Sequence, residues 1–155
     1  MIDQLKNFLQ RKNRVFKLIL YVSIIMYSCL MIWEVFIGPY RSYSGIRRYN
    51  LYPFKTIIDF IRNRSNFGFH VLFINLAANI ITFIPLGFFM SLILKASSKL
   101  KYTFRICVLI VICIELGQFI LNVGVLDIDD VILNSIGCAI GITFYNRIKE
   151  LLIIF

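Results

Sequence analysis

Apolar residues of this 155-residue chain are collected in four long stretches, which shorter polar segments separate. The stretches cover about residues 15–38, 69–94, 103–122 and 130–151. A helix that crosses the hydrocarbon core of a bilayer needs about 20 predominantly apolar residues, and each stretch supplies them. The pattern therefore predicts four transmembrane helices, and we expect one all-α integral membrane domain over residues 1–155.

The long connection between the first two spans, residues 39–68, has a weaker pattern of its own. Its apolar residues at helical spacing are Phe54, Ile57, Ile58 and Ile61, and Lys55, Asp59 and Arg62 lie opposite them. Pro53 suits the first turn of a helix. Because the run is too short to cross the bilayer, we expect a short amphipathic helix in the interface of the first external loop.

Composition supports the membrane assignment: 59% of the residues are hydrophobic, and the mean hydropathy is +0.81. The net charge of +9 comes from 17 basic and 8 acidic residues. The basic residues flank the apolar spans, so they indicate membrane orientation and not a nucleic-acid partner. No phosphate-binding glycine loop is present, which disfavours nucleotide hydrolysis. The cysteines, which we expect to be buried apolar fillers without metal or disulfide roles, are Cys29, Cys107, Cys113 and Cys138.

The short connections differ in charge and so predict the orientation. Residues 95–105 are basic without an acidic residue, whereas residues 123–130 contain three aspartates and no basic residue. The positive-inside rule therefore places both termini and the 95–105 turn in the cytoplasm of a bacterial cell. The first span is too long for a signal-peptide core and is expected to be retained. Trp33 and Glu34, near its far end, are interpreted as interface residues.

The external loop contradicts the same rule, because residues 39–68 contain six basic residues. Arg47 and Arg48 form the most compact part of this charge. A basic cluster on the outer side suggests an anionic partner, such as an anionic lipid headgroup or a lipid-linked cell-wall precursor.

Several polar residues interrupt the predicted spans. They are Asn75 and Asn79 in the second, Glu115 and Gln118 in the third, where Asn122 continues the polar stripe, and Asn134 in the fourth. At 1.5 Å of rise per residue, the residues inside the spans lie roughly 6 to 15 Å from the outer helix ends. We therefore expect them to converge on one outward-facing pocket.

Glu115 is the costliest of these residues to bury, since a charged carboxylate inside a span costs on the order of 3 kcal/mol. We expect it to be protonated or paired. Polar residues in a membrane also serve as hydrogen-bonded contacts between helices, so helix bridging and ligand binding are both open for this group.

The acidic loop and the last span contribute two further motifs. Asp129 and Asp130 precede a helix and suit its positive end. Alternatively, Asp127, Asp129 and Asp130 supply the hard oxygen ligands of a magnesium site or a site for a cationic headgroup. Gly137 and Gly141 have the spacing that allows two helices to approach closely.

Taken together, these blocks resemble the VanZ-like family of bacterial membrane proteins, which is named for a teicoplanin-resistance determinant. The residues that carry the resemblance are Arg48 to Ile57 (RYNLYPFKTI), Asn75 and Asn79 with Phe83 to Gly87 (FIPLG), Glu115 with Gln118, and Asp127 to Asp130 with Asn134 and Gly137. The resemblance as a whole covers about residues 15–150. The basic residue that such sequences often carry shortly before the acidic loop is missing from residues 122–126. The resemblance implies a helical membrane fold and a link to the cell envelope and to glycopeptide susceptibility.

The preferred hypothesis is an envelope protein whose outward pocket binds an anionic or lipid-linked ligand. Its candidate ligand-binding residues are Arg47, Arg48, Asn75, Asn79, Glu115, Gln118, Asp129, Asp130 and Asn134. The first alternative is an intramembrane enzyme that acts on a lipid-linked cell-wall precursor or a phospholipid, with Glu115 or Asp130 as general acid or base and with Mg²⁺ as a candidate cofactor. The second is a non-catalytic helper that packs against another membrane protein through the Gly137 and Gly141 face.

Overall fold

The computed structural model of the chain describes residues 2–38, 47–62, 69–94 and 100–153. The long helices are α1 (Ile2–Ile32), which continues into the π-helix η1 (Trp33–Ile37), then α4 (Phe69–Ile93), α5 (Leu100–Leu121) and α6 (Ile128–Ile153). Within these described residues, four helical segments are long and apolar enough to span a membrane: Arg14–Ile37, Leu76–Ile93, Leu100–Leu121 and Ile128–Lys149. The prediction of an all-α protein that crosses the membrane four times is therefore confirmed.

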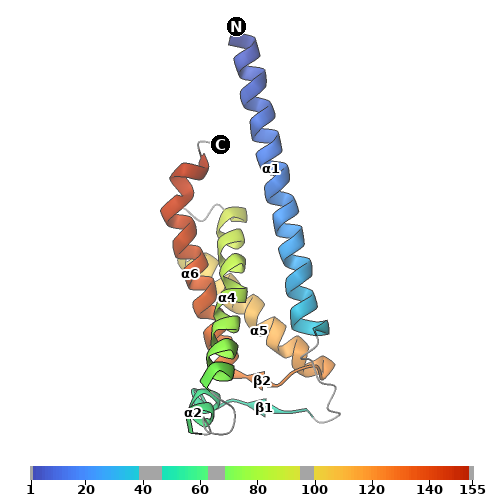
Figure 1. Cartoon of the computed structure of the whole chain (residues 1–155), viewed down its shortest axis with the longest axis vertical. Helices are drawn as coiled ribbons and strands as arrows, with labels where there is room; N and C mark the ends of the chain where they lie inside the picture. Colours follow the sequence, from blue (N-terminus) through green and yellow to red (C-terminus); the bar gives the residue numbers. More distant parts are fainter. Residues whose placement is uncertain (1, 39–46, 63–68, 95–99, 154–155) are drawn as a thin grey trace.

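The connections gather at two opposite ends of the helices (Figure 1). Both termini lie at one end, and the short helix α2 (Lys55–Arg62) lies at the other with the strands β1 (Tyr49–Asn50) and β2 (Leu126–Asp127). The amphipathic helix of the long loop is thus confirmed. The strands were not predicted; they pair in parallel, with Tyr49 opposite Leu126 and Asn50 opposite Asp127. This pairing attaches the long loop to the acidic loop.

Helices α4 and α6 pack closely along a row of glycines. A Cβ atom on Gly137 would lie 2.2 Å from the Ile80 carbonyl oxygen, and one on Gly141 would lie 2.0 Å from that of Ile84. From the other side, a Cβ atom on Gly87 would lie 2.0 Å from the Cys138 carbonyl oxygen. No side chain fits at these positions, so the predicted close approach is confirmed. The glycine face is covered by α4 and is therefore not open to another protein.

A small core lies between α4, α5 and α6, and α1 packs outside it. The core consists of Phe83, Cys107, Val111, Cys138 and Ile142. Two of the cysteines are thus buried fillers, as predicted, whereas Cys29 and Cys113 are exposed on the helix surfaces. All four cysteines are free thiols. Helix α1 is attached by Tyr27, whose hydroxyl donates a hydrogen bond of 2.9 Å to the Thr82 carbonyl oxygen.

Asn122 ends α5. Its φ of 58° lies in the left-handed region that asparagine tolerates. The Val123 N–H donates to the Gln118 carbonyl oxygen (3.0 Å) and the Asn122 N–H to that of Phe119 (3.2 Å), which is the Schellman arrangement of a helix C-terminus. Asn122 therefore directs the chain into β2 and does not extend the polar stripe of Glu115 and Gln118.

Candidate functional site

Polar side chains from four segments surround a cavity of about 160 Å³ near the end of the fold that carries α2 and the strands. They are Glu34 of η1, Asn79 and Thr82 of α4, Glu115 and Gln118 of α5, and Asp130 and Asn134 of α6. Apolar atoms of Val35, Ala78, Phe83 and Ile114 complete the wall. We call this the polar cavity. Five of the sequence-predicted site residues meet here, and the side chain of Asn75 lies outside the described residues.

Hydrogen bonds hold the walls of the polar cavity together. The Asn134 Nδ2 donates to Glu115 Oε1 at 3.3 Å, and the Asn79 Nδ2 donates to Asp130 Oδ1. The Gln118 Nε2 donates to the Val35 carbonyl oxygen at 2.9 Å. These bonds connect α5 with α6, α4 with α6, and α5 with η1. The polar residues therefore bridge helices and line a cavity at the same time, because the two uses do not exclude each other.

Glu34 is a site residue that the sequence analysis placed in the interface instead. The π-helix η1 places it in the wall of the polar cavity, which Glu115 and Asp130 also line. In η1 the Gly38 N–H donates to the Trp33 carbonyl oxygen five residues earlier, at 2.8 Å. Such a turn shifts the direction in which side chains leave the helix, and π-bulges are frequent at functional sites. The signal in the sequence was a carboxylate at the end of an apolar span.

The charge of the polar cavity is acidic. Three carboxylates line it, and no lysine or arginine of the described residues does. Glu115 has only 3% of its surface exposed, so water contributes little to its solvation. A low-dielectric cavity with carboxylate and amide walls favours a cationic group or hydrogen-bond donors over an anion. An anionic ligand group would therefore have to bind outside it.

Arg47 and Arg48, predicted to be part of the same pocket, do not line the polar cavity. Arg47 is exposed; its Nη2 donates to the Ile120 carbonyl oxygen at 3.5 Å, and its guanidinium lies 5.8 Å from the centre of the Phe119 ring. It thus lies at the negative end of α5. The carbonyl oxygen of Arg48 accepts a hydrogen bond from the Leu126 N–H at 3.1 Å, next to the paired strands.

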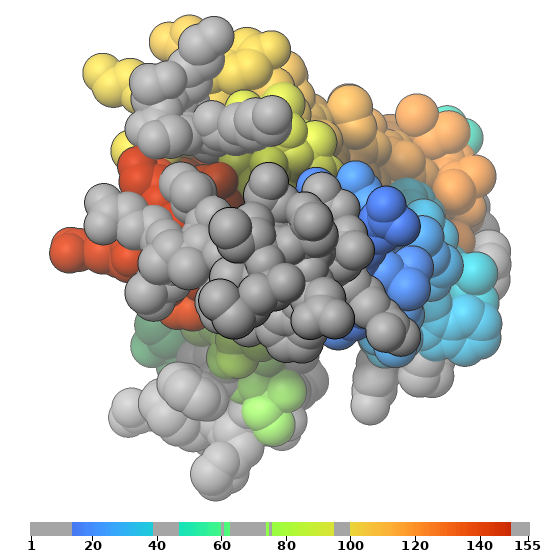
Figure 2. Space-filling view, turned by 90° about the horizontal axis from the view of Figure 1, so that it is seen from above, coloured from blue at the N-terminus to red at the C-terminus, as the bar shows by residue number. Residues whose placement is uncertain are grey.

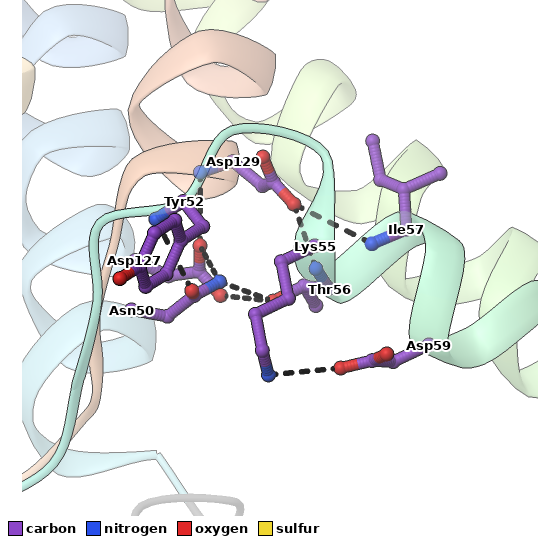
Figure 3. Close-up of polar contacts among 8 residues, drawn as sticks. All are labelled: Asn50, Tyr52, Lys55, Thr56, Ile57, Asp59, Asp127 and Asp129. Atoms are coloured by element: carbon purple, nitrogen blue, oxygen red, sulfur yellow. Dashed lines mark hydrogen bonds and ion pairs between the residues drawn. The ribbon is translucent and has the colours of Figure 1, made fainter.

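Asp129 does not line the polar cavity. Its carboxylate faces the first turn of α2 (Figure 3). Its carboxylate accepts hydrogen bonds from the backbone N–H groups of Phe54, Thr56 (3.0 Å) and Ile57 (3.4 Å). The exposed N–H groups at a helix start need such acceptors. Asp129 does lie in the first turn of α6, where a carboxylate suits the positive helix end, as predicted. The hydrogen bonds of its carboxylate, however, cap α2, more than 70 residues earlier in the sequence.

Asp127 is the residue that caps α6. Its Oδ1 accepts a hydrogen bond of 2.9 Å from the Asp129 N–H in the first turn. The same carboxylate also accepts hydrogen bonds from the Asn50 Nδ2 at 3.2 Å and from the Thr56 hydroxyl (Figure 3). Asn50 and Thr56 were not predicted as site residues, although both belong to the motif that carries the family resemblance.

The three loop aspartates do not assemble a magnesium site. Asp127 faces Asn50 and Thr56, Asp129 faces the start of α2, and Asp130 faces Asn79 across the polar cavity. Among the residues that the structure describes, no group of three or more carboxylate, thiol or imidazole side chains has the arrangement of a metal site. The three loop aspartates therefore do not fit a Mg²⁺ ion, and we assign no role to Mg²⁺ in this protein.

Phe54, directly before α2, has an unusual backbone. Its φ of 63° is left-handed, a conformation that a bulky side chain rarely adopts. The hydrogen bond from its N–H to Asp129 accompanies this conformation. Strained backbone that surrounding contacts maintain is concentrated at functional sites.

The comparisons with known proteins agree with the resemblance described above. Neither the curated proteins nor the solved structures include a match to the chain. A family model, VanZ/LLP1, matches residues 16–152. Because this match covers nearly the whole chain, and the described residues include four helices long and apolar enough to span a membrane, the protein is a multi-pass membrane protein that belongs to the VanZ/LLP1 family.

Proposed function

We propose that this VanZ-family protein of the bacterial cell membrane binds the headgroup of an envelope lipid, either a phospholipid or a lipid-linked cell-wall precursor, that carries both an amine and a phosphate. The single observation that carries the proposal is the convergence of three carboxylates and three side-chain amides on one cavity, from four segments of the chain. Ionisable groups inside a membrane are costly and mark ligand or ion sites by default.

The ligand chemistry follows from the two charged regions at this end of the fold. The acidic polar cavity suits the amine and other hydrogen-bond donors of a headgroup. The anionic phosphate suits Arg47 and Arg48, which lie outside the cavity. Parallel pairing of β1 with β2 attaches the arginine segment to the acidic loop, three residues before Asp130 of the cavity wall. In this arrangement the phosphate is the anionic partner expected for the basic cluster. The amine-bearing part of the headgroup binds in the polar cavity.

Orientation and phenotype complete the proposal. We place both termini in the cytoplasm, so that the polar cavity opens to the outer side, where envelope precursors are used. The resemblance to the VanZ-like family suggests that the protein affects teicoplanin susceptibility. In this proposal the protein influences susceptibility by binding a lipid headgroup at the outer face of the membrane.

The test replaces Glu115 with glutamine, which keeps size and hydrogen bonding but removes the ionisable carboxyl. A hydrogen bond to a charged group contributes about 1.5–3 kcal/mol, so we expect lipid retention after purification to fall on the order of tenfold or more. The teicoplanin susceptibility of cells that express the variant should change together with lipid retention. Unfolding stability should stay at or above the wild-type value, because a desolvation cost is relieved.

Asp59→Asn is the matched control, since it removes a partly exposed carboxylate at the same end of the fold but outside the polar cavity. It should leave lipid retention and susceptibility unchanged. Undiminished lipid retention in Glu115→Gln would mean that the polar residues only bridge helices.

A second candidate function is an intramembrane enzyme that acts on the same class of lipid. The observation that favours it is that Glu115 and Asp130 line the same cavity, as a general acid and a general base would have to. Purified protein supplied with phospholipid or lipid-linked precursor would then form product. Asp130→Asn and Glu115→Gln would each abolish turnover, whereas a pure binding protein gives no product with any variant.

A further inference from the structure

A second cavity of about 330 Å³ lies at the opposite end of the fold, between the first turns of α5 and the last turns of α6. Its apolar lining consists of Leu100, Phe104, Ala139 and Ile142, and its polar lining of Lys101, Thr143, Asn146 and Arg147. We call it the basic groove. Seen from the end that carries the termini, the start of α5 (yellow) lies next to α6 (red) (Figure 2).

The basic groove has a polar end and an apolar floor. Lys101 and Arg147 are exposed and supply one cation from each helix, whereas Ile142 is buried. Arg147 lies eight residues beyond Ala139 on α6, which corresponds to about 12 Å along the helix axis. The groove therefore extends from a basic rim at the helix ends toward the apolar middle of the spans. No aspartate or glutamate of the described residues lines it.

Asn146 adds an unsatisfied acceptor at the polar end. Its Nδ2 donates to the Ile142 carbonyl oxygen of the same helix at 2.9 Å. Its Oδ1 is buried and accepts no hydrogen bond from the described residues. A buried acceptor without a donor costs about 1–3 kcal/mol. A hydroxyl-bearing ligand in the groove could supply the donor after a small movement of this side chain.

We propose that the basic groove binds one anionic glycerophospholipid, with the phosphate between Lys101 and Arg147 and one acyl chain along Phe104, Ala139 and Ile142. Two cations at one rim select a negative headgroup, and basic pockets between transmembrane helices are known to bind such headgroups. The apolar floor selects a lipid over a soluble phosphate. The site is at the other end of the helices from the polar cavity, so this proposal does not depend on the proposed function.

The first test measures the preference of purified protein for dioleoyl phosphatidylglycerol over dioleoyl phosphatidylcholine, by native mass spectrometry of lipid adducts in a neutral detergent. Wild type should retain phosphatidylglycerol preferentially. The double variant Lys101→Gln and Arg147→Gln should lose about tenfold or more of this preference, equal to about 1.4 kcal/mol. The matched control is Arg14→Gln with Lys17→Gln, which removes two exposed cations from α1 and should have no effect.

The second test fills the apolar floor of the basic groove and leaves Lys101 and Arg147 in place. Thr143 is exposed, and its hydroxyl bonds only within its own helix, to Ala139 at 2.8 Å, so Thr143→Phe should fold normally and fill the groove. Phosphatidylglycerol retention should fall as in the charge variant. An equal preference of wild type for the two lipids, an equal loss in the α1 control, or full retention in Thr143→Phe would each overturn the proposal.

Discussion

The hydrogen bonds of Asp129 allow the sharpest prediction about stability. Only 1% of Asp129 is exposed, and its carboxylate accepts three backbone N–H groups at the start of α2. In Asp129→Asn one carboxylate oxygen becomes an amide N–H₂ group, which then faces N–H donors. One or two hydrogen bonds are lost, and their donors remain unsatisfied. Since bonds to charged groups contribute about 1.5–3 kcal/mol each, we expect a loss of about 3 kcal/mol in unfolding free energy.

Unfolding by sodium dodecyl sulfate in mixed micelles measures this loss, and limited trypsin digestion shows where it arises. Release of α2 should speed cleavage after Lys55 and Arg62 before the spans unfold. The control is Asp59→Asn, which breaks only the exposed ion pair of 2.9 Å with Lys55 (Figure 3). That pair is worth about 0.5 kcal/mol or less. A change of less than about 0.5 kcal/mol in Asp129→Asn, with unaltered cleavage, would refute the capping role.

Three further predictions concern packing, charge and orientation. Gly141→Leu should cost more than about 3 kcal/mol in the same unfolding titration, because its side chain would collide with the backbone of α4; near-native stability would contradict the close packing. The double variant Arg47→Gln and Arg48→Gln should keep its expression level but weaken lipid retention and alter teicoplanin susceptibility, and wild-type behaviour would reduce the cluster to ordinary interface charge. In cells, a membrane-impermeant thiol reagent should label a cysteine at Val125 and not one at Ser97, and the reverse pattern would invert the orientation.

The spans and the amphipathic helix were predictable because local pattern determines them. Hydropathy over some 20 residues indicates a span whatever its neighbours are. Helical spacing also placed Glu115 and Gln118 on one face, and helix rise placed Asn79 and Asn134 at a matching depth. Depth places these residues at one level of the helices, but it does not determine which of them meet; the hydrogen bonds of Asn134 with Glu115 and of Asn79 with Asp130 show this.

The remaining features depend on partners that are distant in the sequence. Asp129 has a strong local reason to cap its own helix, and only the packing of α2 against α6 shows that it caps another. The strands are two residues long, too short for an alternating pattern to reveal them. The position of the Glu34 side chain could not be predicted without the π-helix, because regular helical spacing does not apply across it.

Asp129 and Asp130 are neighbours in the first turn of α6, yet they serve different parts of the molecule. One holds the start of α2 at the surface, and the other forms part of the cavity wall with Asn79. A single helical turn therefore connects the support of α2 with the wall of the polar cavity. If the proposed headgroup displaces Asp130, it must alter the docking of α2. Thermodynamic reciprocity then requires that a molecule bound to α2 changes the affinity of the cavity for the headgroup by the same factor.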